Sequence, residues 1–318
     1  MASKPHRSKR AGRRGRSGYV LSFILGALLV FLGYSYFSHF SGERTRRPGT
    51  PSRKASPADK SGQDRPHDFG FSKQDAPIPQ PSVKKEEGQP SPSGAGGKPK
   101  IAIVIDDLGG ENHLSRELLL LDFPLTLAIL PFTTYSKPLA IDAHQKEKEV
   151  ILHLPMEPYG YPKVKPGEGV LLQEMDEERL LRQLSKDIES IPNIRGVSNH
   201  MGSRLMEDPE KLKIIFSDLK RRGLFFLDSR TTPQTVGLRT ARLVGLKAME
   251  RTLFIDNLLE EEAIKKNFDR LIRASLSTGI AIGIGHPHSM TIQSIREMVP
   301  KMKEKGIEIV PLSALFNG

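Results

Sequence analysis

The sequence predicts an α/β fold for residues 100–318, built on a parallel β-sheet with helices on both faces. Two observations support this class. Short apolar segments alternate along the chain with longer segments of helical periodicity. This alternation is typical of parallel strands joined by helices, arranged either as a barrel or as a doubly wound sheet. The 219 residues of this region are also enough for a single hydrophobic core.

The expected elements follow one another in order. We expect strands at 101–106, 125–130, 150–154, 195–199, 224–228, 248–255, 280–285 and 307–310. We expect helices at 112–121, 136–148, 176–190, 208–222, 259–278 and 290–305. Asp176 and Asp208 occupy positions of helix N-caps, with acidic residues in the turns that follow. Gly223 and Gly306 lie where glycine commonly ends a helix.

The N-terminal part of the chain predicts a membrane anchor. Residues 1–16 contain seven Lys or Arg and no acidic residue, and residues 17–40 contain no charged side chain. The apolar run from Tyr19 to Phe37 is long enough to cross a bilayer, which takes about 20 residues in a helix. The basic tail is then expected in the cytoplasm. The C-terminal domain is expected on the other side of the inner (cytoplasmic) membrane, in the periplasm. A cleaved signal peptide is the alternative, although the apolar run is longer than usual for one and no clear cleavage site follows.

Residues 41–99 predict a disordered linker. They are rich in Pro, Ser, Gly and Lys and almost free of aliphatic residues, so they cannot bury enough apolar surface to fold. The segments before residue 100 carry the chain's whole net charge of +11, because residues 100–318 are close to neutral. A nucleic-acid-binding domain needs a clustered basic face, so the sequence argues against that class.

Composition limits the kinds of metal site that the chain can build. The chain contains no cysteine, which excludes disulfides and thiolate ligands. Any metal ion must therefore be held by His, Asp, Glu or water. Such ligands suit zinc or another divalent transition metal.

Polar residues lie at the ends of five of the predicted strands or just after them. In chain order they are Asp106 and Asp107; His153 and Glu157; Asn199, His200 and Ser203; Asp228; and His286 and His288. Taken singly, a strand-end His commonly bonds a backbone carbonyl, and an Asp commonly caps a helix. The carboxyl ends of parallel strands meet at one edge of a sheet, so together these residues predict a functional site. His113 and His144 lie on predicted helices and are expected to face solvent.

The neighbouring carboxylates of Asp106 and Asp107 suggest a division of roles. One would be a ligand of a divalent cation, and the other would act as a base on an attacking water. A His across the rim would protonate the leaving group. This arrangement is typical of metal-assisted hydrolysis.

Six motifs then resemble a known family. VIDDLGG, HLPMEP, SNHMGS, FFLDSRTT, FIDN and IGIGHPH occur in this order across residues 100–318. Together they resemble the divergent polysaccharide deacetylase family, which is related to the metal-dependent deacetylases of carbohydrate esterase family four. The resemblance implies a distorted (β/α)₇ barrel and an extracytoplasmic sugar polymer as substrate.

The resemblance also implies roles for particular residues. Asp106 matches the base, Asp107 a metal ligand, and His286 the histidine that assists the leaving group. His153 matches the first histidine of an H-x-x-x-H metal motif, whose second position here is Glu157. SNHMGS replaces an arginine motif of the family, so His200 is preferred over Glu157 as the third ligand. Arg204 or Arg230 would replace the missing positive charge, and a purely structural role for either is as well supported.

Three functions remain open from the sequence. The first is a membrane-anchored, metal-dependent deacetylase that acts on N-acetylated envelope polysaccharide such as peptidoglycan. The second is a catalytically inactive envelope module with a vestigial metal site that binds glycan or protein. The third is a hydrolase of phosphate esters or other amides with the same metal. The sequence carries no signal for an oligomeric state.

Overall fold

A computed structural model describes Met1 and residues 97–110 and 113–317. Apart from Met1 and residues 97–99, the predicted basic tail, membrane anchor and linker lie outside the described residues. Within the part of the chain that is described, no helix combines the length and the apolar character needed to cross a membrane.

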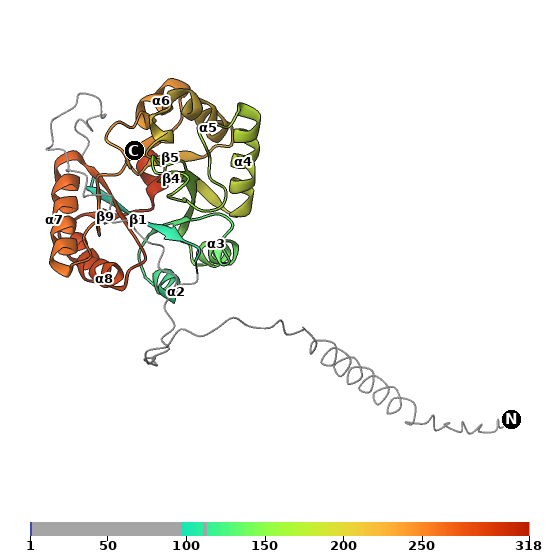
Figure 1. The fold of residues 1–318 in the computed structure, drawn as a ribbon. Coiled ribbons are helices and arrows are strands. Elements are labelled where there is room, and N and C mark those ends of the chain that lie inside the picture. The colour runs from blue at the N-terminus through green and yellow to red at the C-terminus, as the bar shows by residue number, and fades with distance from the viewer. Residues whose placement is uncertain (2–96, 111–112, 318) are drawn as a thin grey trace, which may run out of the picture. The chain divides into compact units, whose positions relative to one another are not determined.

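One curled sheet of nine parallel strands forms the centre of the domain (Figure 1). Its strands are β1 Lys100–Leu108, β2 Thr126–Ile129, β3 Glu149–Met156, β4 Ile194–Met201, β5 Phe225–Asp228, β6 Ala248–Glu250, β7 Leu253–Phe254, β8 Ile280–Gly285 and β9 Glu308–Ile309. Their order is β6-β5-β4-β3-β2-β1-β8-β7, and β9 pairs with the start of β1. Each pairing is parallel, so the predicted β/α class is confirmed.

Helices surround the curled sheet and give the domain the form of a half-barrel (Figure 1). They are α2 His113–Leu119, α3 Ser136–Gln145, α4 Glu177–Ser190, α5 Pro209–Arg221, α6 Gly237–Val244, α7 Glu261–Thr278 and α8 Ser289–Glu304. Two 3₁₀ helices, η1 Leu205–Glu207 and η2 Leu312–Asn317, complete the described elements. The sequence did not predict α6, η1 or η2.

The predicted helix ends are confirmed at α4 and α5. Asp176 accepts a hydrogen bond from the Arg179 backbone N–H at 2.7 Å and caps α4. Asp208 caps α5 in the same way. Gly223 follows α5 with a φ of 73°, the left-handed conformation that glycine adopts without steric cost. His113 and His144 are exposed on α2 and α3, as expected.

The predicted strand 248–255 is wrong as a single element. β6 pairs with β5, whereas β7 pairs with β8, and these partners lie toward opposite ends of the strand order. Between them the backbone N–H of Arg251 donates to the carbonyl of Asp228, and that of Thr252 donates to the carbonyl of Ile282. The curl of the sheet brings its two edges close enough for one short segment to bond to both. This contact between distant strands is not visible in a local apolar pattern.

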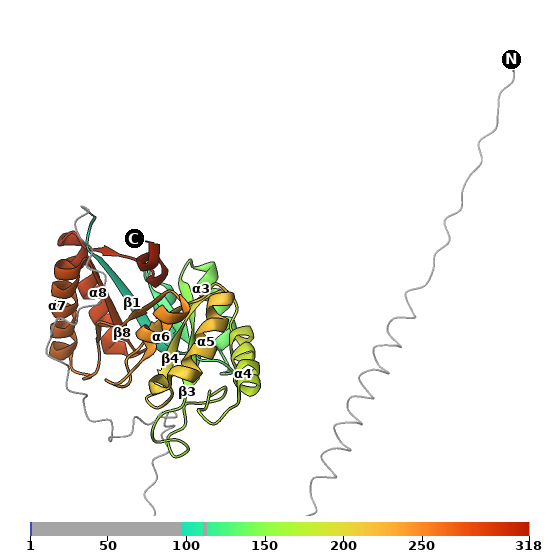
Figure 2. The same ribbon diagram turned by 90° about the horizontal axis from the view of Figure 1, so that it is seen from above.

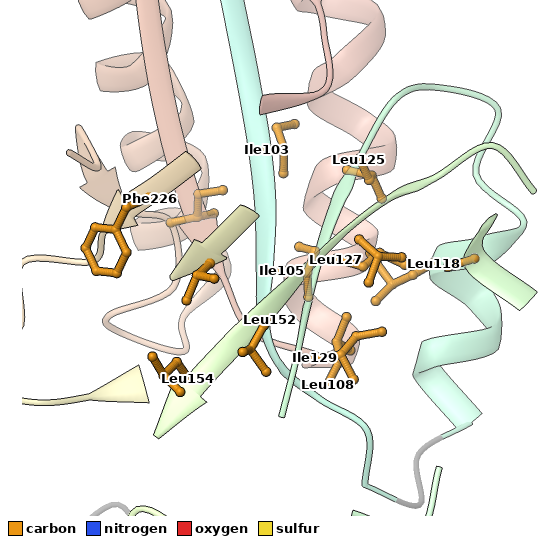
Figure 3. Packing of buried hydrophobic residues seen from close by; sticks show 14 of the residues in the cluster. Ile103, Ile105, Leu108, Leu118, Leu125, Leu127, Ile129, Leu152, Leu154 and Phe226 are labelled. Atoms are coloured by element: carbon orange, nitrogen blue, oxygen red, sulfur yellow. The ribbon is translucent and has the colours of Figure 1, made fainter. Parts of the chain in front are cut away.

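Alternate side chains of the strands point to two separate apolar layers. Ile101, Ile103 and Ile105 of β1 belong to the large cluster between the sheet and its helices, part of which is seen in Figure 3. Ala102 and Val104 of β1 belong to a smaller cluster on the inner face. Alternation between faces is the geometry of any β-strand. The same alternation determines which polar side chains at the strand ends face the inside of the half-barrel.

The C-terminal segment covers the amino-terminal end of the sheet. Leu312 and Leu315 of η2 join the inner cluster, and the backbone N–H of Leu312 donates to Oγ1 of Thr126 at the start of β2. The backbone N–H of Ser313 donates to Glu149 at the start of β3. In Figure 2, the C-terminus and the loop that follows β3 lie at opposite ends of the sheet. The polar side chains lie at the opposite end of the sheet, where the strands have their carboxyl ends.

Candidate functional site

Three strands carry a polar residue on the inner face at their carboxyl ends. On β1 the series Ala102 and Val104 continues to Asp106. On β3, Ile151 is followed two residues later by His153, and on β8 Ile284 is followed by His286. The side chains of Asp106 and His153 are almost fully buried. The inner face therefore changes from apolar to ionisable at the rim.

Asp107, His153 and His200 form a tight cluster at this rim. Oδ1 of Asp107 lies 3.1 Å from Nε2 of His153 and 2.8 Å from Nδ1 of His200. The two ring nitrogens are 3.1 Å apart. The three side chains each offer one ligand atom, and these atoms lie within 4.8 Å of one another. The cluster joins β1, β3 and β4.

The backbone explains how two neighbouring aspartates reach different places. Asp107 has a φ of 58°, so the chain leaves the extended conformation at this residue. Asp106 stays on the inner face, with Oδ2 3.7 Å from Nε2 of His153. Gly109 then turns the chain with a φ of 115°, where an added Cβ would lie 2.6 Å from Oγ1 of Thr133. Strained backbone is common at functional sites.

The donor set of this cluster fits a divalent cation. Oδ1 of Asp107 is buried and, although close to two imidazole nitrogens, has no hydrogen bond of acceptable geometry among the described residues. Nδ1 of His153 lies 2.8 Å from Oγ of Ser198, which leaves Nε2 for the centre of the cluster. An outer partner of this kind fixes the ring of a metal-binding histidine. One carboxylate oxygen and two imidazoles suit zinc and similar ions.

The two aspartates also differ in acidity. Burial raises the pKa of Asp106 above its usual range, against the opposing effect of His153 and His286. Burial acts in the same direction on Asp107, yet His153 and His200 hold its pKa well below the usual range. Asp107 is therefore ionised, as a metal ligand must be. Asp106 has the stronger affinity for a proton.

On the other side of the site, the partly buried His286 pairs with the buried Asp256. Nδ1 of His286 donates to Oδ1 of Asp256 at 2.9 Å, and its backbone N–H donates to Oδ2 at 2.6 Å. Thr291 also donates to Oδ2. Burial lowers the pKa of His286, but Asp256 and, to a smaller extent, the charges of Asp107 and Asp106 more than offset this and raise it to about 9. His286 is thus a cation at neutral pH and can donate a proton.

The remaining predicted residues hold the rim together. Asn199 bonds the carbonyl of Met201 and the backbone N–H of Ser229, and Asp228 accepts from Arg230 and Thr235. Ser203 accepts from the backbone N–H of Tyr159. The backbone N–H of His288 donates to the carbonyl of His286 at 2.7 Å, and the ring centroids of the two histidines are 6.3 Å apart.

Glu157 makes a different set of contacts from the cluster. Its Oε1 accepts from Nη1 of Arg204 at 2.9 Å, and its Oε2 accepts from the backbone N–H of Gln173 at 2.6 Å. Arg204 thus bonds Glu157 through Nη1 and Gln173 through Nε. Arg230 forms an ion pair with Glu250 at 3.2 Å. Both arginines already have an acidic partner within the described residues.

The sequence indicated no separate role for Asp256, Ser198 or Arg251. Asp256 lies in the motif FIDN and Ser198 in SNHMGS, so the motifs contained the signal but not the contact. Arg251 stacks on the ring of Phe254, whose centroid is 5.7 Å from that of His286. Its guanidinium donates to the carbonyls of Ser229 and Arg230, and burial lowers its pKa to about 10.

Known proteins resemble this domain in sequence and in fold. Uncharacterized protein YibQ of Escherichia coli strain K12 is 33% identical over 218 residues, which are 69% of this chain and 67% of that protein. An uncharacterized protein of Haemophilus influenzae is 29% identical over 220 residues, or 69% of this chain and 77% of that protein. The crystal structure of uncharacterized protein ATU2773 from Agrobacterium tumefaciens C58 matches with a TM-score of 0.66 and 28% identity, covering 71% of this chain and 92% of that one.

A family model describes the same region. Residues 103–316 match the model of the divergent polysaccharide deacetylases, a region that begins within β1 and includes all the clustered side chains. This agrees with the resemblance carried by the six motifs. The chain therefore belongs to the divergent polysaccharide deacetylase family.

Proposed function

We propose that this chain is a divalent-metal-dependent deacetylase of N-acetylated envelope polysaccharide, with peptidoglycan as a representative substrate. The convergence of Asp107, His153 and His200 carries the proposal, since their ligand atoms lie within 4.8 Å of one another. Family membership supports a carbohydrate substrate. We further propose zinc as the ion, because a carboxylate and two imidazoles are among its preferred ligands.

The surrounding residues have the positions that amide hydrolysis requires. A divalent ion held by Asp107, His153 and His200 would supply Lewis acidity, polarising a carbonyl and making water more acidic. Asp106 lies beside this cluster with a raised pKa, and its buried Oδ1 has no hydrogen-bond partner among the described residues. Asp106 is therefore suited to accept the proton of an attacking water.

His286 supplies the complementary acid. With a pKa near 9 it carries the proton that an amine leaving group needs, and the buried Asp256 fixes the orientation of its ring. An acid and a base with different proton affinities in one buried site are the pattern expected for hydrolysis. The amine product of an N-acetyl sugar would leave protonated.

The cellular setting is also a proposal. The basic residues 1–16 and the apolar run within residues 17–40 support a single-pass anchor in the cytoplasmic membrane, followed by a tether through residue 99. The domain would then act in the periplasm. Envelope polysaccharide is the acetylated glycan accessible from that side.

Acetate release tests the function. The full chain, loaded with zinc, is incubated with peptidoglycan glycan strands and with β-1,4-linked N-acetylglucosamine oligomers. We expect acetate release that chelation abolishes and that His144→Gln, an exposed histidine on α3, leaves unchanged. Glycan binding without acetate release under any divalent ion would instead favour a catalytically inactive binding module.

A further inference from the structure

An exposed tyrosine near the candidate metal site is hydrogen-bonded through both its backbone and its phenolic hydroxyl. Tyr159 follows β3 and has 62% of its surface exposed. Its backbone N–H donates to Oγ of Ser203 at 3.2 Å, and its phenolic hydroxyl donates to Oε2 of Glu207. Glu207 in turn accepts from Thr232 in the loop after β5. Tyr159 is thus bonded to the segment that follows β4, and that segment is bonded in turn to the loop after β5.

The loop that carries Tyr159 is also closed at its base. The backbone N–H of Glu157 donates to the carbonyl of Leu171 at 3.0 Å, and that of Leu171 donates to the carbonyl of Pro155 at 2.9 Å. The ion pair between Glu157 and Arg204 lies under the same segment. The backbone on which Tyr159 stands is therefore well anchored.

Tyr159 lies near the candidate metal ligands. Its partner Ser203 lies three residues after His200, a stretch that can span at most about 11 Å. Tyr159 is thus close to the cluster, but not part of it. A glycan lying across the rim would meet the tyrosine with a sugar unit near the one whose acetyl group reaches the ion.

An aromatic ring that is already ordered binds a ligand at a lower cost in free energy than a mobile one. Tyrosine offers a large amphipathic surface, and binding costs less when the side chain is already ordered. A pyranose ring has an apolar face of C–H groups that packs well on an aromatic ring, while its hydroxyls reach nearby polar groups. Arg204, half-exposed at 48%, supplies such a group beside the tyrosine.

We propose that Tyr159 forms a subsite that binds a pyranose unit of the glycan chain by stacking. This inference rests on the proposed polysaccharide substrate and adds a specificity for oligomers over single sugars. Glu207 and Ser203 are positioning residues for the ring. The phenolic hydroxyl serves to orient the ring, and the ring itself provides the contact.

Calorimetry on the metal-free full chain tests the subsite without depending on catalysis. The probes are the β-1,4-linked N-acetylglucosamine pentamer and the monosaccharide. We expect Tyr159→Ala to weaken pentamer binding about tenfold or more, and Tyr159→Phe to stay within about threefold of the parent. The control is Leu243→Ala, which removes an apolar side chain that is 80% exposed on α6, and it should change nothing.

Two results would overturn the subsite. One is an unchanged pentamer affinity in Tyr159→Ala, and the other is an equal loss in Tyr159→Phe and Tyr159→Ala. Thermal unfolding of both variants checks that they fold. Acetate release is measured separately. If its rate does not depend on Tyr159 for any oligomer, the subsite is rejected and the proposed function stands. Tyr159-dependent binding without release removes the proposed function and keeps the subsite.

Discussion

Nδ1 of His286 donates a hydrogen bond of 2.9 Å to Oδ1 of Asp256, and the two side chains form a partly buried ion pair beside the candidate metal cluster. The pair joins the end of β8 to the segment after β7. It keeps an imidazolium in a site where burial alone would favour the neutral ring. The hydrogen bond between the segments that follow β7 and β8 therefore keeps His286 protonated for the proposed reaction.

Replacing Asp256 should leave the His286 ring largely unprotonated at neutral pH. In Asp256→Asn the pKa of His286 should fall from about 9 toward its ordinary value near 6.5, because the neutral amide no longer stabilises the cation. The alkaline limb of the pH–rate profile should shift down with it. NMR titration of the histidine ring carbons measures the pKa directly. A His286 pKa that stays near 9 would show that Asp256 is not its cause.

The same pair predicts a pH dependence of stability. The folded pKa of His286 is raised, so its contribution to the free energy of unfolding is complete below pH 6.5 and is lost as the pH rises through about 9. The pKa of Asp256 is lowered, so its contribution to the free energy of unfolding is lost as the pH falls below the ordinary pKa of an aspartate. The difference in melting temperature between the parent and Asp256→Asn should be largest between these limits. Calorimetric unfolding across pH 3–10 checks this, and a constant difference would contradict it.

The two candidate third ligands can be separated by metal affinity. His200→Gln should lower zinc affinity by more than the roughly 10- to 100-fold expected for loss of an outer partner, because it removes a ligand atom. Glu157→Gln should leave zinc affinity unchanged but lower the free energy of unfolding by about 1–3 kcal/mol. The side chain loses its charge, and one of the two oxygens that accept from Arg204 and Gln173 becomes an NH2 group that cannot accept. Competition with a zinc-chelating dye measures the first quantity and urea unfolding the second. The opposite pattern would assign Glu157 as the ligand.

Ser198 should matter through His153. Its hydroxyl lies 2.8 Å from Nδ1 of that ring and fixes which nitrogen faces the cluster. Ser198→Ala should lower zinc affinity by about 10- to 100-fold while leaving the ligand set intact. Ser217→Ala, on the exposed face of α5, is the matched control. Equal affinities for the two variants would mean that Ser198 does not orient the ligand.

The burial of the Asp187 carboxyl predicts that its replacement, away from the site, stabilises the protein. This carboxyl on α4 is fully buried, Oδ1 accepts from Gln183, and Oδ2 has no partner among the described residues. Burial raises its pKa to about 8, so the folded state loses stability as the pH rises from about 4 to 8. Asp187→Asn should therefore add about 1–3 kcal/mol to the free energy of unfolding at pH 8 and little at pH 4. A gain that does not depend on pH would exclude this explanation.

Local patterns predicted much of the fold and of the candidate site. The apolar runs of β1, β3 and β8, and the polar residues that follow them, indicated a parallel sheet with a polar rim. Asp176 and Asp208 marked helix starts because capping is a contact within a few residues. What local patterns could not supply were contacts made by the curl of the sheet. These include the division of 248–255 between two edges and the pairing of Asp256 with His286.

Acetate release by the zinc-loaded full chain and by Asp106→Asn tests the central claim most directly, provided that both proteins hold equal zinc by elemental analysis. We predict that the parent releases acetate from N-acetylated glycan strands and that the variant is slower by about 100-fold or more, because the proposed base has lost its proton affinity. Release by Asp106→Asn at the parent rate would contradict the assignment of Asp106. No release by the zinc-loaded parent from any N-acetylated glycan would contradict the proposed deacetylase itself.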